Sequence, residues 1–351
     1  MQWDIYCRVV DNFGDVGFGW RLASDLAARG EAVRFLLDDR RALGWLAPRG
    51  FPGLVIGTWA DARTDGTPAD VVVETFGCGL PAACVASMKA SPRPAVWIDV
   101  EYLSAEPYVE RSHGRPSPQV DGLTRWFFYP GYTAATGGLL REPDLAQRQR
   151  LFDSARWLRA VGLEPKDQTH PGARLVSLFC YRAPALPALL DELAAAPARL
   201  FAAAGRASRQ VEDALGPALA RGALSAVLLP RFSQRDCDHL LWASDLNFVR
   251  GEDSFVRAQW AGVPFVWQIY PQDDRAHVAK LEAFLDRFLA TAPPPLATQI
   301  RGVFLAWNGL GPWAGLPDPA AWRSHCAAWR ADLWAQAALG TRLIDFATSK
   351  C

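Results

Sequence analysis

The residues best suited to chemistry stand on a short polar turn, 250–254, directly after the apolar run 246–249. The turn carries Glu252, Asp253 and Ser254, and a helical pattern follows it. Backbone N–H groups at the start of a helix, together with the helix dipole, suit a phosphate group. We therefore expect a diphosphate site here, beside a carboxylate with a separate task. The structural alternative is that Asp253 or Ser254 caps the helix and Glu252 is exposed.

A second acidic pair lies near the N-terminus, where the first apolar run meets the first expected helix. Asp11 and Asp15 are four residues apart, and Gly14 and Gly17 favour a sharp turn. In a doubly wound sheet this turn faces the ligand crevice, so the two carboxylates could converge on one group. An Asx turn at Asp11 and a helix cap at Asp15 explain the pattern equally well. The GxGxxG order of a dinucleotide fingerprint is absent.

Aromatic and polar residues also follow two other apolar runs. Phe179 and Tyr181 end the run 175–180, and Tyr270 begins a polar segment that continues to Arg275. Either group could contact a nucleotide or a sugar, or belong to the core and to a capped turn. The histidines are dispersed, and no HExxH, GxSxG or Walker motif occurs, so these residues predict no zinc protease, hydrolase or P-loop enzyme.

Composition limits the classes of protein that fit. The 351 residues are 50% hydrophobic and carry a formal net charge of zero, which does not favour binding to nucleic acid or to a membrane surface. No apolar run is long enough to cross a bilayer, and the N-terminus lacks a signal sequence. The seven cysteines are scattered, which is typical of reduced thiols. We therefore expect a cytoplasmic protein without a structural metal site.

Apolar runs alternate with helical patterns in two series, separated by a polar region near 141–171. The alternation predicts two doubly wound, mostly parallel sheets, and hence an α/β protein of two Rossmann-like domains that bind ligand in a cleft between them. The expected strands are 3–10, 32–37, 71–73, 95–98, 175–180, 200–203, 226–229 and 246–249. The expected helices are 20–29, 183–195, 237–243, 275–289 and 320–339.

Several of these segments together resemble one known family. They are Asp-Asn-Phe-Gly-Asp-Val-Gly at 11–17, Leu-Phe-Cys-Tyr at 178–181, the long stretch 247–262, and Trp-Gln-Ile-Tyr-Pro-Gln at 267–272. Segments 97–108 and 127–131 support the match. The chain resembles, over nearly its whole length, the elongation factor P arginine rhamnosyltransferases (EarP).

The resemblance implies a GT-B glycosyltransferase fold. Residues 1–155 would bind the acceptor, residues 165–328 would bind the nucleotide sugar, and a C-terminal helix at about 330–351 would pack back on the first domain. The implied reaction moves L-rhamnose from TDP-β-L-rhamnose, with inversion, to a guanidine nitrogen of a loop arginine on translation elongation factor P. The modified factor would relieve polyproline stalling. The family needs no metal and no cofactor beyond its donor substrate.

The resemblance also assigns roles to individual residues. Asp11 and Asp15 match the paired acceptor-side aspartates, and Glu252 matches the catalytic-site glutamate. The donor would contact Phe179, Tyr181, Phe232, Gln234, Arg250, Asp253, Ser254, Tyr270 and Gly14. The sequence departs from the family pattern at Arg231 and Cys237, where aromatic residues are common, so the contacts to the thymine base are less defined.

The chemistry of guanidinium suits this assignment. Guanidinium is protonated at neutral pH and is a poor nucleophile, and a carboxylate pair can grip it and accept a proton as the C–N bond forms. We assign Asp15 as the general base and Asp11 as the orienting partner; Glu252 could support either the acceptor nitrogen or the sugar. The alternatives are a GT-B transferase with another acceptor, such as a lipopolysaccharide sugar, and a non-catalytic nucleotide-sugar-binding protein.

Overall fold

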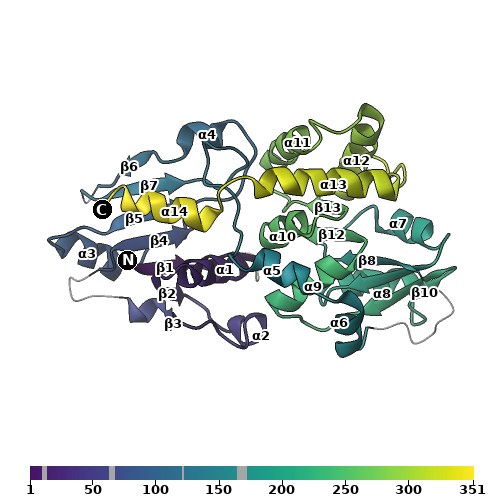
Figure 1. Cartoon of the computed structure of the whole chain (residues 1–351), viewed down its shortest axis with the longest axis horizontal. Coiled ribbons are helices and arrows are strands. Elements are labelled where there is room, and N and C mark those ends of the chain that lie inside the picture. The colour runs from purple at the N-terminus through teal and green to yellow at the C-terminus, as the bar shows by residue number, and fades with distance from the viewer. Residues whose placement is uncertain (10–13, 63–67, 121, 164–171) are drawn as a thin grey trace. The chain divides into compact units, whose positions relative to one another are not determined.

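The computed structural model describes residues 1–9, 14–62, 68–120, 122–163 and 172–351. The chain forms two compact units (Figure 1). The first contains Met1–Ala146 and Leu333–Cys351, and the second contains Gln147–Asp332. Among the described residues, no helix is both long enough and apolar enough to span a membrane.

The first unit is built on a seven-stranded sheet with the order β3-β2-β1-β4-β5-β7-β6. Only β6, which pairs with β7, is antiparallel. Strand β1 lies inside the sheet, with β2 and β3 added on one side of it and β4 and β5 on the other, as in a doubly wound sheet. The strands are β1 (Gln2–Cys7), β2 (Ala32–Leu37), β3 (Leu54–Thr58), β4 (Val71–Thr75), β5 (Val96–Val100), β6 (Pro116–Pro118) and β7 (Thr124–Phe128).

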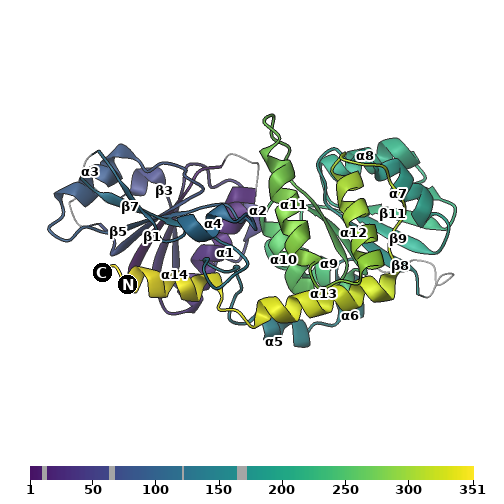
Figure 2. The same ribbon diagram turned by 90° about the horizontal axis from the view of Figure 1, so that it is seen from above.

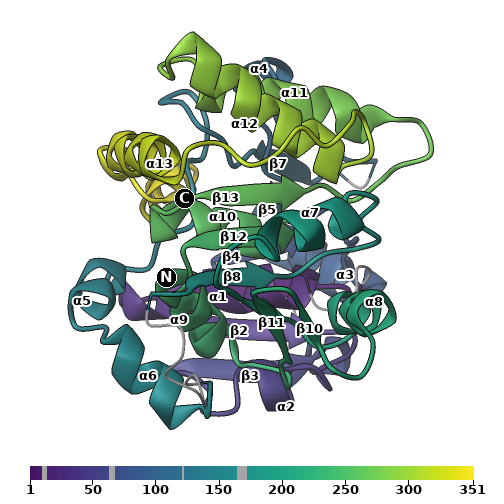
Figure 3. The same ribbon diagram turned by 90° about the vertical axis from the view of Figure 1, so that its right-hand side faces the viewer.

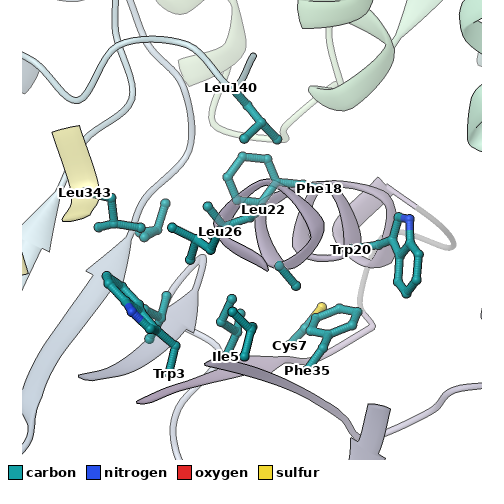
Figure 4. Close-up of a cluster of buried hydrophobic side chains, with 14 of the residues drawn as sticks. Trp3, Ile5, Cys7, Phe18, Trp20, Leu22, Leu26, Phe35, Leu140 and Leu343 are labelled. Atoms are coloured by element: carbon teal, nitrogen blue, oxygen red, sulfur yellow. The ribbon is translucent and has the colours of Figure 1, made fainter. Parts of the chain in front are cut away.

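Helix α1 (Gly14–Ala28) packs on this sheet and begins well before the expected start at residue 20. Gly14 and Gly17 therefore lie in helix, and the expectation that both form a sharp turn is wrong. Glycine lowers helix propensity, which hid the first turns. Further along α1, Gly19 is closely packed, since a Cβ there would lie 2.8 Å from the ring of Phe35. Figure 4 shows side chains of α1 and β1 converging in the core around Leu22 and Leu26.

The other helices of this unit before its boundary are short: α2 (Leu43–Leu46), the 3-10 helix η1 (Trp59–Asp61), α3 (Ala82–Ala90) and α4 (Tyr108–Ser112). Helix α5 (Leu145–Arg150) spans the boundary between the units.

The C-terminal segment contributes to both units. Helix α13 (Pro319–Trp334) belongs almost wholly to the second unit, and α14 (Leu339–Thr348) packs on α1 in the first (Figure 2). The expected single helix over 320–339 is therefore wrong. The Arg141 guanidinium donates to the carbonyls of Trp334, at 2.8 Å, and Gln336, at 3.0 Å. These bonds satisfy carbonyls where α13 ends and hold the connection to α14.

The second unit has a six-stranded sheet with the order β10-β11-β9-β8-β12-β13. Figure 3 views the protein from the side on which Figure 1 shows this unit. Only β10, which pairs with β11, is antiparallel. The strands are β8 (Arg174–Leu178), β9 (Ala198–Ala202), β10 (Ala220–Arg221), β11 (Leu224–Leu228), β12 (Leu246–Arg250) and β13 (Phe265–Gln268). The helices are α6 (Ser154–Ala160), α7 (Leu186–Leu193), α8 (Arg206–Leu215), α9 (Gln234–Ala243), α10 (Asp253–Ala261), α11 (Ala276–Phe288) and α12 (Pro294–Trp307).

Candidate active site

The candidate donor residues gather at one edge of the second sheet. Strands β8, β12 and β13 are neighbours and run parallel. Their carboxyl ends therefore lie side by side, and this edge is where open α/β sheets bind ligands. Tyr181 follows β8, Arg250 ends β12 and Tyr270 follows β13.

The turn after β12 depends on a glycine. Gly251 has φ +63°, a left-handed conformation that suits glycine. Its carbonyl accepts a hydrogen bond of 2.7 Å from the Trp267 indole N–H on β13. The tight turn brings the chain directly from the strand into α10, so that the helix N-terminus stands at the ligand edge of the sheet.

Glu252 occupies the N-cap position of α10, and the helix begins at Asp253 without a side-chain cap bond. The prediction that Asp253 or Ser254 caps the helix is therefore wrong. The Ser254 hydroxyl instead donates to the carbonyl of Arg250 and accepts from its N–H at 3.2 Å. Ser254 thus ties the first turn of α10 to the end of β12.

Aromatic rings surround the guanidinium at this edge. The Arg250 guanidinium carbon lies 4.3 Å from the ring centroid of Phe179 and 4.4 Å from that of Tyr181. The ring of Tyr270 meets that of Tyr181 edge-on, with centroids 5.4 Å apart. Tyr181 is 6% exposed, whereas Tyr270 is 54% exposed. Four predicted donor residues therefore form one cluster, in which a cation contacts two aromatic rings.

Two glutamine side chains hold the loop that carries Tyr181. Gln268 accepts from the Tyr181 N–H and donates to the Arg182 carbonyl, both at 2.7 Å. Gln210 of α8 donates to the Tyr181 carbonyl at 2.7 Å and accepts from the Ala183 N–H at 3.0 Å. Sequence reasoning missed this role of both glutamines, although Gln268 lies inside the motif at 267–272.

Helix α9 adds another predicted donor residue. Gln234 is its first residue, is buried, and donates to the Asp253 carboxylate at 3.5 Å. The buried Asp238 carboxylate accepts two hydrogen bonds of 2.9 Å from Arg257 of α10. This bidentate pair fixes α9 against α10, so the two helix N-termini are held together.

Phe232 packs in a different aromatic group. Its ring meets Trp157 of α6 edge-on at 5.9 Å, and Trp157 in turn contacts His239. Cys237, on the first turns of α9, is exposed. Sequence reasoning missed Trp157, whose only signal was its place in the short segment before the polar stretch 164–171.

In the first unit, Asp15 lies in the first turn of α1 and is only 5% exposed. It follows Gly14, the first residue of that helix; Asp11 lies outside the described residues. Burial above all, with a smaller contribution from the Asp15 charge, raises the pKa of the Cys7 thiol at the end of β1. Asp15 therefore lies close to the carboxyl end of β1, and Cys7 is a poor nucleophile.

Buried carboxylates that sequence reasoning missed lie at the same edge of this sheet. Glu74 on β4 and Asp99 on β5 are at most 1% exposed. Arg125 of β7 donates to Glu74 at 3.0 Å and lies 3.4 Å from Asp99. Burial, then the nearby Glu74 charge, raises the pKa of Asp99 to about 7. An acidic residue inside each of two apolar runs was the available signal.

Within the described part of the chain, no group of three or more His, Cys, Asp or Glu side chains is arranged to hold a metal ion. All seven cysteines are free thiols.

Two sheets of this topology, each with its polar residues at the carboxyl ends of the strands, define a GT-B glycosyltransferase fold. The fold matches that of MurG from Acinetobacter baumannii, with a TM-score of 0.50 at 14% identity over 99% of both chains. It also matches the spinosyn forosaminyltransferase SpnP, with a TM-score of 0.51 at 12% identity and 99% coverage of both chains. The predicted fold class is confirmed.

The family is equally clear. The model of the family described as Elongation-Factor P (EF-P) rhamnosyltransferase EarP matches residues 3–348. The protein-arginine rhamnosyltransferase of Pseudomonas aeruginosa is 42% identical, with 98% of each chain aligned. A structure described as the basis for EarP-mediated arginine glycosylation of translation elongation factor EF-P has a TM-score of 0.69 at 32% identity, covering 100% of this chain and 99% of that one. The chain belongs to the EarP family of glycosyltransferases, as its sequence motifs predicted.

Proposed function

We propose that this chain transfers L-rhamnose, with inversion, from TDP-β-L-rhamnose to a guanidine nitrogen of a loop arginine on translation elongation factor P. The family match over residues 3–348 carries this proposal. The relatives are named protein-arginine rhamnosyltransferases, which supports arginine as the acceptor. Modification would activate the factor for relief of polyproline stalling, and a translation factor as acceptor places the reaction in the cytoplasm.

The donor site belongs to the second unit. In this unit the N-terminus of α10, at Asp253 and Ser254, directs the positive end of the helix dipole at the diphosphate, and Arg250 adds a positive charge. Phe179, Tyr181 and Tyr270 offer aromatic surface for the sugar and base. Gln234, bonded to Asp253, joins α9 to this site. With amides and a guanidinium available for the leaving diphosphate, the reaction as proposed uses no metal.

The acceptor chemistry belongs to the aspartates of the first unit. Asp11 orients the guanidinium and Asp15 accepts one of its protons. The freed nitrogen lone pair attacks the anomeric carbon as the bond from that carbon to the diphosphate oxygen breaks. The oxygen keeps the bonding electrons, and the substituted guanidinium keeps its single positive charge. One attack from the face opposite the diphosphate accounts for inversion without a protein nucleophile, and Glu252 supports the acceptor nitrogen or the sugar.

The test is the intact mass of the cognate elongation factor P after incubation with this enzyme and TDP-rhamnose. A gain of one deoxyhexose is expected, and an acceptor with lysine in place of the arginine should gain nothing. Asp15→Asn should keep the fold and donor binding but lower turnover by roughly 10²- to 10⁴-fold, the usual contribution of a general base. Asp191→Asn, which alters a 69%-exposed side chain on α7, is the matched control and should retain full activity.

Two other outcomes would redirect the proposal. Binding of TDP-rhamnose with no mass change in the factor would point to a different acceptor or to a non-catalytic nucleotide-sugar-binding protein. Unchanged turnover in Asp15→Asn would remove Asp15 from the role of base.

A further inference from the structure

Three aromatic rings form a ladder that leads from α1 to the surface of the first unit. Phe18 is 4% exposed and its ring centroid lies 4.9 Å from that of Phe76. Phe76 in turn stacks on Tyr102, with centroids 4.0 Å apart and planes only 4° from parallel. Tyr102 is 43% exposed. The Tyr102 ring at the end of this ladder is therefore partly exposed to solvent on one side and packed against Phe76 on the other.

The ladder stands beside the general base assigned above. Strands β1, β4 and β5 are adjacent, with neighbouring strands about 5 Å apart. Phe76 directly follows β4 and Tyr102 lies two residues after β5, so both emerge at the edge where β1 leads to α1. Phe18 lies one helical turn after Asp15, on the same side of α1.

The loop that holds the middle ring is in an unusual conformation. Phe76 has φ +58°, in the left-handed region that a bulky residue rarely adopts. The buried Asp99 carboxylate accepts from the Gly77 N–H, and that of Glu74 accepts from the Gly79 N–H, both at 2.9 Å. The Phe76 N–H donates to the Val100 carbonyl at 2.8 Å. Conformations of this kind persist where the surroundings enforce them and cluster at functional sites.

We propose that Tyr102 is a binding residue for the acceptor: its ring stacks on the guanidinium of the arginine that receives the sugar. Guanidinium is planar, weakly hydrated and permanently charged, and it stacks on tyrosine faces more readily than an ammonium does. Stacking holds the plane of the acceptor while leaving its edge nitrogens for the aspartates. Glu74 and Asp99 act through the 76–79 loop and are positioning residues. This inference rests on the proposed function.

A double-mutant cycle tests the contact directly. Binding of the acceptor protein, with its arginine intact or replaced by alanine, is measured for wild-type enzyme and for Tyr102→Leu. With the arginine present, Tyr102→Leu should weaken binding by roughly 2- to 30-fold, the range of a cation–π contact. With the alanine acceptor, the same substitution should change nothing. Tyr102→Phe should restore arginine-dependent binding, and TDP affinity should stay constant throughout.

Tyr108→Leu is the matched control, because Tyr108 is also exposed, at 40%, but its ring meets Tyr129 outside the ladder. Any effect of that substitution should be the same for both acceptors. The proposal is overturned if Tyr102→Leu weakens binding of both acceptors equally, or of neither. Tyr102→Lys provides a second measure, since a cation there should repel the arginine acceptor more than the alanine one. Glycosylation of the acceptor by wild-type enzyme tests the proposed function separately.

Discussion

Replacing Gln268 by leucine should loosen the attachment of the loop that carries Tyr181 to strand β13. Leucine has a similar size but can neither accept from the Tyr181 N–H nor donate to the Arg182 carbonyl, two bonds of 2.7 Å. Tyr181 is 6% exposed, so water replaces these partners poorly. Each buried polar group left without its bond costs about 1–3 kcal/mol. We expect the free energy of unfolding to fall by roughly 2–4 kcal/mol, allowing for relaxation of the loop.

The same substitution should weaken donor binding, because Tyr181 would no longer be held against Arg250 and Tyr270. Loss of one aromatic contact to a nucleotide is worth roughly 1–3 kcal/mol, so the Kd for TDP should rise by about 5- to 150-fold. Urea unfolding gives the stability and titration calorimetry with TDP gives the affinity. Both measurements use the full chain, at a temperature where each variant is folded.

Gln336→Leu is the matched control in the first unit, where the Gln336 side chain donates to the Tyr132 carbonyl at 3.0 Å. It should lower stability and leave TDP affinity unchanged. If Gln268→Leu is destabilised but binds TDP as tightly as wild type, then the loop is held by Gln210 alone and the positioning role of Gln268 is refuted.

Two further predictions concern the first unit. Gly340→Ala should destabilise the fold by roughly 2–4 kcal/mol, since its Cβ would lie 1.9 Å from the buried Asp25 carboxylate, which accepts from Arg29. Gly302→Ala, at an open position of α12, should instead stabilise by about 0.5–1 kcal/mol, and equal effects in urea unfolding would contradict the packing argument. The second prediction concerns pH. Burial raises the pKa of Asp99 to about 7 in the folded state, from 3.8 in the unfolded state. Between these two values the folded state binds more protons than the unfolded state, so the stability that Asp99 contributes falls as pH rises from about 4 to 7. Asp99→Asn should reduce the slope of stability against pH in this range. Some slope should remain, because burial also raises the pKa of the Asp25 carboxyl to about 7. A profile parallel to that of the wild type would refute the assignment to Asp99.

The sequence by itself determined the two parallel sheets and the family. Apolar runs such as 246–249 are long enough for strands and too short for helices, and the chain alternates them with helical patterns. The turn at Gly251 was readable because glycine between an apolar strand and a polar helix start marks a left-handed residue. These features depend on neighbouring residues, so periodicity and turn chemistry reveal them.

Only the tertiary structure decided the contacts that hold the site. Gln268 bonds to a residue 87 positions away and Arg125 to one 51 positions away, and no local pattern encodes such partners. The early start of α1 at Gly14 opposes glycine's own helix preference, and the close packing of Gly19 on Phe35 is a contact between segments distant in the sequence. At the break between α13 and α14, the carbonyls of Trp334 and Gln336 accept hydrogen bonds from Arg141, which lies 193 and 195 positions away from them in the sequence. Burial and hydrogen-bond partners arise between segments that meet only in the folded chain, so a reading along the sequence cannot supply them.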